Sequence, residues 1–196
     1  VGQAVVDDHC RPSVYVEHGH RSVVLWTNHN ADNILHCRVG GVGAVDRWGD
    51  DQPHSQGGSV VSYSQIYRIA SKSDADTDHF IVFTRHLLTS YTWRFRTLEV
   101  DQATGSATWG TLTNLFTFGD DQGYIQTAPV VMGDGAQGVR VGLATNPATA
   151  AEHDIYLVEI DLDDGTVYDT AGNDLANLYE PANLPVATSD LDPAIV

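Results

Sequence analysis

The sequence predicts an all-β protein, and two observations support this fold class. No window long enough for a helix has a convincing 3.6-residue apolar period, whereas short runs rich in Val, Ile, Thr, Tyr, Phe and Trp are separated by Gly, Asp, Asn and Pro. The runs also recur at a long and nearly constant interval. Four short strands in each repeat of this length are typical of a β-propeller, in which every repeat forms one antiparallel blade.

The expected strands fall into three groups of four along the chain. The first group comprises residues 12–17, 22–29, 33–39 and 45–48. The second comprises residues 60–70, 79–86, 91–100 and 107–118, and the third residues 124–132, 138–145, 153–162 and 165–169. We therefore expect one β-propeller region over 1–196, with blades at about 5–50, 58–118 and 122–170 and the start of a further blade at 184–196.

The groups resemble one another at two places. The expected second strands share an apolar residue followed two positions later by Thr, and these threonines recur at nearly equal intervals: Thr27, Thr84 and Thr145. An aromatic residue recurs in the expected fourth strands with almost the same period: Trp48, Trp109 and Tyr168. A β-sandwich of about ten strands is the alternative, but sandwiches seldom repeat one strand pattern at near-equal spacing. Three groups do not close a typical ring, so further chain segments or subunits would have to complete it.

The amino-acid composition limits the kinds of molecule that the protein is expected to bind. Of 196 residues, 26 are acidic and 10 basic, the formal net charge is −16, and Lys72 is the one lysine. Such a surface repels nucleic acids and anionic membranes. No run of about 18 apolar residues predicts a membrane span. The acidic, lysine-poor composition resembles that of proteins from halophilic archaea or their viruses, and an ordinary acidic secreted protein is the alternative.

Neither metal nor cofactor binding is predicted. Cys10 and Cys37 lack the spacing of a metal-ligand pair, and we expect free buried thiols because a bridge between their strands would be geometrically difficult. A single disulfide is the alternative. His18 and His20 flank a turn glycine and are expected to be exposed. The Asp-rich loops do not follow the EF-hand pattern, so we expect solvated loops, with a structural Ca²⁺ as the open alternative.

Four side chains of catalytic type stand near strand ends in the first two groups: His9, His29, Tyr63 and Arg85. Because the innermost strands of a propeller line its central channel, these side chains would converge at one mouth of the ring. Cleaving a uronate polysaccharide by β-elimination requires three groups. One neutralises the carboxylate, one removes the neighbouring proton, and one protonates the leaving oxygen. Arg suits the first task, and His and Tyr suit the other two.

Four short stretches resemble the propeller ulvan lyases and related BNR-repeat proteins, which are seven-bladed propellers that cut acidic algal polysaccharide by elimination. They are residues 8–13 (DHCRPS), 28–30 (NHN), 62–64 (SYS) and 83–85 (FTR). The resemblance extends as a loose strand pattern over about residues 5–170. It implies that His9 and His29 are the two catalytic histidines, Tyr63 the acid or base, and Arg85 the clamp on the substrate carboxylate.

Neighbouring polar side chains are expected to bind the substrate, namely Arg11, Asn28, Asn30 and His86. The chain departs from the family at Cys10-Arg11, where the family has Asn-rich residues, and in the acidic loop 74–78. A local group of arginines would have to offset the acidic surface around an anionic substrate: Arg11, Arg21, Arg85, Arg94 and Arg96. The expected partner is an acidic polysaccharide or a cell-surface glycan, and the expected location is extracellular or on a virion or cell surface.

Other roles compete with catalysis. His29 and His86 occupy equivalent repeat positions and could cap strands, whereas His9 could be an exposed turn residue. Tyr63 could line the core or channel, and Arg85 could pair with Asp78. At the level of the whole protein, a non-catalytic propeller module that binds a glycan or receptor is the alternative to a polysaccharide lyase. A purely structural role is the third hypothesis.

Overall fold

The computed structural model describes residues 12–28, 31–87, 91–118, 123–145, 155–180, 182, 184–188 and 191. Their regular structure is almost entirely β-strand, and helix is limited to short 3₁₀ turns such as η1 (Ala70–Lys72). The strands form sheets of four, five and six strands, and nearly all neighbours pair antiparallel. The expected all-β class is therefore confirmed. In the described part of the chain, no helix has the length and apolar character needed to cross a membrane.

The chain divides into two compact units, which are described separately. Unit 1 comprises Val1–Leu88 and Arg94–Leu112, and unit 2 comprises Thr89–Trp93 and Thr113–Val196. Strand β7 contributes its first residues to unit 2 and the remainder to unit 1.

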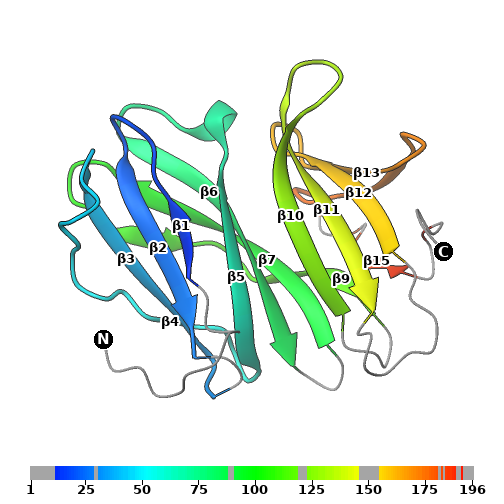
Figure 1. Ribbon diagram of the computed structural model, residues 1–196, viewed down its shortest axis with the longest axis horizontal. Coiled ribbons are helices and arrows are strands. Elements are labelled where there is room, and N and C mark those ends of the chain that lie inside the picture. Colours follow the sequence, from blue (N-terminus) through cyan, green and yellow to red (C-terminus); the bar gives the residue numbers. More distant parts are fainter. Residues whose placement is uncertain are drawn as a thin grey trace. The chain divides into compact units, whose positions relative to one another are not determined.

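Unit 1 contains two sheets that face one another (Figure 1). The first sheet has the order β1-β2-β3-β4, and in the second the strands run β7-β6-β5 with β8 paired to β7. The strands of the first sheet are β1 (Ser13–Tyr15), β2 (Arg21–Thr27), β3 (Ile34–Val42) and β4 (His54–Ser55). Those of the second are β5 (Val60–Arg68), β6 (Thr77–Leu87), β7 (Tyr91–Asp101) and β8 (Ala107–Trp109).

One half of the space between these sheets is apolar. Because alternate residues of a strand share a face, each strand turns one set of side chains inward. The inward residues form one buried cluster: Val23, Leu25, Leu35, Cys37, Val39, Ile66, Phe80, Val82, Leu98 and Val100. The rings of Tyr15 and Phe80 meet edge to face, with centroids 4.9 Å apart. Burial of this cluster contributes to the hydrophobic stabilisation of unit 1.

The buried region continues along the strands into a polar half. The same strands that supply the apolar cluster also bury Ser64, Thr84, His86 and Arg96. Ser13 Oγ lies 2.9 Å from Ser64 Oγ, which joins β1 to β5. Buried polar groups must be hydrogen-bonded to be tolerated, so these side chains need polar partners inside unit 1.

Unit 2 is built on one five-stranded antiparallel sheet of order β10-β11-β12-β13-β14. Its strands are β10 (Gly123–Val131), β11 (Gln137–Thr145), β12 (Ile155–Asp161), β13 (Thr166–Asp169) and β14 (Asp174–Asn177). In addition, β9 (Thr113–Thr117) pairs in parallel with β15 (Val186–Ala187). The buried face of the five-stranded sheet carries Val139, Val141, Leu143, Val158, Ile160 and Val167.

A turn of the same construction follows β7 in unit 1 and β12 in unit 2. Gly105 and Gly165 have positive φ angles of 76° and 85°, and their N–H groups donate to the carbonyls of Asp101 and Asp161. Each Asp side chain also accepts backbone N–H bonds within its turn. The interval between the two turns is close to the period expected from the sequence.

Three sequence expectations about individual strands were wrong. Trp48 forms only an isolated bridge to Gly40, and the strand that pairs with the beginning of β3 is His54–Ser55. Trp109 pairs with Leu98 of β7, and the residue that pairs with the equivalent Val158 of β12 is Asp169. Tyr168 is therefore one position away from the repeat equivalent of Trp109. The expected strand 107–118 divides into β8 and β9 around Gly110. A Cβ on Gly110 would lie 2.1 Å from Oγ1 of Thr97 on β7, so the chain passes β7 too closely there for a side chain.

Candidate functional site

The sequence-predicted site residues divide into described and undescribed sets. His9, Arg11, His29 and Asn30 lie outside the described residues. Asn28, Tyr63, Arg85 and His86 are described and all belong to unit 1.

Tyr63 lies at a β-bulge between β5 and β6. Ser62 pairs with Arg85 and Ser64 with Thr84, so Tyr63 is the extra residue on β5. Its φ angle is 50°, and it is the non-glycine residue with positive φ in the described part of the chain. This backbone conformation is unfavourable for an aromatic residue and is found most often where a side chain is redirected for function.

The bulge brings Tyr63 against Arg85. The Arg85 guanidinium carbon lies 4.5 Å from the centroid of the Tyr63 ring, and Arg85 Nε donates to Ser62 Oγ at 3.1 Å. Arg85 is 3% exposed, whereas Tyr63 is half-buried. Two of the four predicted catalytic side chains are therefore in contact. A guanidinium this close to an aromatic ring makes a favourable cation–π contact, which holds the Tyr63 ring beside Arg85.

His86 follows Arg85 on β6 and therefore points to the opposite face of the sheet. The imidazole is fully buried, with Nδ1 2.8 Å from Ser59 Oγ and Nε2 2.8 Å from Thr84 Oγ1. Burial, with the positive charges of Arg94 and Arg96, lowers the pKa of His86 to about 3. His86 is thus a neutral residue in the polar half of the unit 1 interior, on the other face of the sheet from Tyr63 and Arg85.

Asn28 follows the end of β2 and takes part in a local loop network. Its Nδ2 donates to Asp32 Oδ2 at 2.7 Å, while Asp32 Oδ1 accepts the N–H of Ile34 at 2.9 Å. These bonds order the residues that lead into β3. Asn28 therefore has a structural part in this loop.

Sequence reasoning missed the principal buried carboxylate of unit 1. Asp78 is fully buried and accepts from Arg68 Nε at 2.6 Å and Gln102 Nε2 at 2.6 Å, with His20 Nδ1 at 3.0 Å. Arg68 is thus the arginine that pairs with Asp78, a pairing that the sequence analysis had considered for Arg85. His20 also takes part in this network. No local spacing signals these contacts, because His20 and Asp78 are far apart in the sequence and meet only through the fold.

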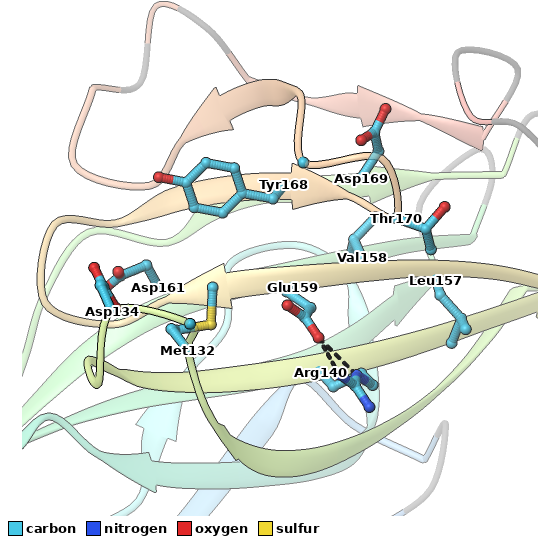
Figure 2. Close-up of a pocket in the computed structure, with 12 residues that line it drawn as sticks. Met132, Asp134, Arg140, Leu157, Val158, Glu159, Asp161, Tyr168, Asp169 and Thr170 are labelled. Carbon is cyan, nitrogen blue, oxygen red and sulfur yellow. Dashed lines mark hydrogen bonds and ion pairs between the residues drawn. The ribbon is translucent and has the colours of Figure 1, made fainter.

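A second candidate site is a groove on unit 2 with a volume of about 540 Å³ (Figure 2). Arg140 of β11, Glu159 of β12 and Tyr168 of β13 stand side by side across three strands, because Arg140 pairs with Glu159 and Glu159 with Tyr168. Arg140 Nε donates to Glu159 Oε1 at 2.8 Å. Asp134 and Asp169 also line the groove. An aromatic ring with carboxylates and an ion pair can contact a sugar ring and its hydroxyls.

In the described ranges, no group of three or more His, Cys, Asp or Glu side chains is arranged so that it could hold a metal ion. Cys37 is a free thiol in the core, and burial raises its pKa to about 12. A thiol protonated over the physiological range is unreactive. Cys10 lies outside the described residues.

Comparison of the chain with protein-family models and with curated proteins gives no match to either.

Proposed function

We propose that the chain forms blades of a β-propeller that cleaves uronate-containing polysaccharide by β-elimination, with Tyr63 as the group that exchanges a proton with the substrate. The observation that carries the proposal is the redirected Tyr63, held at a positive φ on a β-bulge with its ring over the Arg85 guanidinium. The two turns that end at Gly105 and Gly165, which recur at nearly the period of the sequence repeat, support the repeated blades.

In this proposal the elimination needs no cofactor. The C–H bond beside the uronate carboxylate breaks and a base takes the proton. The electron pair forms a C=C bond, the C–O bond to the leaving sugar breaks, and the leaving oxygen takes up a proton. Tyr63 and the histidines His9 and His29 supply the base and the acid. An acidic polysaccharide outside the cell, or on a cell surface, is the corresponding substrate.

The burial of Arg85 changes the role that we assign to it. A side chain that is 3% exposed, with Nε already donating to Ser62, is poorly accessible to a substrate carboxylate. We assign Arg85 as a positioning residue that orients Tyr63 and stabilises its phenolate form. Neutralising the substrate carboxylate then falls to Arg11.

Ultraviolet absorbance of the unsaturated uronate product tests the proposal on the full chain with a panel of uronate polysaccharides. Tyr63→Phe removes the proton-transferring hydroxyl and should abolish product formation. Arg85→Met should retain some activity but shift the alkaline limb of its pH profile upward, because the phenolate loses a neighbouring cation.

Tyr67→Phe is the matched control, because Tyr67 lies on the same strand and its ring centroid lies 6.3 Å from that of Phe83. This variant should keep the wild-type rate. If Tyr63→Phe is as active as Tyr67→Phe, Tyr63 is not the proton-transferring group.

A non-catalytic glycan-binding module is the second candidate, and the groove of Figure 2 favours it. The Arg140–Glu159 pair and the Tyr168 ring form an open, mixed aromatic and polar surface suited to a sugar. If wild-type protein releases no product but binds a glycan array, and Tyr168→Ala removes that binding, this second function replaces the first.

A further inference from the structure

Arg96 is a buried cation whose hydrogen bonds are incomplete. It is 6% exposed, and its Nε and Nη1 atoms are buried with no hydrogen-bond acceptor among the described residues. On β7 it shares a face with Leu98 and Val100, which belong to the apolar cluster between the two sheets of unit 1. The guanidinium therefore points into the interior, where an unbalanced charge is strongly disfavoured.

The described groups around Arg96 do not balance its charge. Its guanidinium carbon lies 5.8 Å from the centroid of the Trp109 ring, and Trp109 stacks on His54 at 5.3 Å. Burial and Arg96 both lower the pKa of His54, and the pKa of His86 is likewise lowered in part by Arg96. Trp109 and His54 are both half-buried, so this side of Arg96 borders solvent.

We propose that Arg96 is the centre of an anion-binding site in the interior of unit 1, bordered by Trp109 and His54, and that its ligand is a small oxyanion such as sulfate or a carboxylate. An oxyanion offers several acceptor oxygens to the unpaired guanidinium N–H groups and balances the charge. The site is separate from Tyr63 and Arg85, which contact each other on the other face of the sheet. It requires no cleavage reaction.

Thermal unfolding of the full chain with sodium sulfate or sodium acetate tests this site, with sodium chloride at equal ionic strength as the reference. At about ten times Kd, the oxyanion should raise Tm by about 3 to 6 °C above the chloride reference. Arg96→Met should lose this rise. Arg47→Met, which removes an exposed arginine of the same unit, should retain it.

A second readout is the fluorescence of Trp109. Titration with the oxyanion should give a saturable change that Trp109→Phe and Arg96→Met both remove. If sulfate and acetate have no more effect than chloride, or if Arg96→Met responds as the wild type does, there is no such site. A result of that kind would leave the Tyr63 proposal intact, because the elimination assay does not depend on Arg96.

Discussion

His86 shows at the residue scale how burial controls a titratable side chain. Its pKa of about 3 in the folded protein lies far below the ordinary value of 6.5, because burial and two nearby arginines oppose the charged form. The unfolded chain therefore binds a proton at higher pH than the folded one. This group supports folding above about pH 6.5, and its contribution is lost as the pH falls towards 3.

Urea unfolding of wild type and His86→Gln between pH 7 and pH 4 measures this effect. At pH 7 the variant should be less stable, because it loses the paired hydroxyl contacts of Ser59 and Thr84. The stability difference should shrink by about 1.4 kcal/mol per pH unit below pH 6.5. His18→Gln, at an exposed position, should track the wild type. A difference that stays constant with pH would contradict a buried neutral imidazole.

Individual site residues were predictable only in part. Tyr63 and Arg85 could be chosen from the sequence because both stand in short motifs at strand ends, and they do lie in contact. The burial of Arg85 was not predictable, since both faces of β6 are covered over most of its length and an arginine is ordinarily expected at the surface. The Asp78 network was also beyond local patterns, because its partners come from β5, from the β1–β2 turn and from the turn after β7.

At the scale of elements, the two turns that end at Gly105 and Gly165 have the same construction. Gly165 has a φ of +85°, and a Cβ there would lie 2.5 Å from Cδ2 of the Tyr179 ring. Gly105 has a φ of +76°, but its Cβ would come no closer than 3.3 Å to its nearest neighbour, Arg21 Nη1. The same substitution is thus more disruptive in the second turn than in the first.

Alanine substitutions at these glycines should rank the two turns by the stability that each variant loses. Gly165→Ala should cost more than the roughly 1–2 kcal/mol of a left-handed backbone alone, because the Tyr179 ring must also move. Gly105→Ala should cost about that backbone term. Gly133→Ala, at a loop position with no atom near its Cβ and no positive φ, should stay within about 0.5 kcal/mol of wild type. Equal losses at all three positions, measured by denaturant unfolding, would refute this interpretation of the turns.

Strand existence was more predictable than strand pairing. The second strands were placed correctly because Leu25, Val82 and Leu143 mark an apolar periodicity that burial requires, and all three are fully buried. Short strands such as β4 and β14 escaped prediction because two to four residues carry little periodicity. The parallel pairing of β15 with β9 joins segments that lie far apart in the sequence, with all of β10 to β14 between them, and local patterns are uninformative at such a separation.

At the scale of the whole molecule, the net charge of −16 is the dominant property. Like charges on a compact surface repel one another, and salt screens that repulsion over about 10 Å at 0.1 M and about 3 Å at 1 M. We expect Tm to rise as NaCl increases from 0.1 M to 2 M, well beyond the effect of sucrose at equal osmolarity. A Tm that is flat or falls with salt would argue against an adaptation to high salinity.

The central claim is that side chains from separate strands act on one uronate around Tyr63. The most direct measurement is an experimental structure of the full chain with a bound uronate oligosaccharide. We expect the Tyr63 hydroxyl and the imidazoles of His9 and His29 to lie within about 2.6–3.2 Å of the same sugar or its linking oxygen. A structure with the sugar bound elsewhere, and with these three side chains far apart, would contradict the claim.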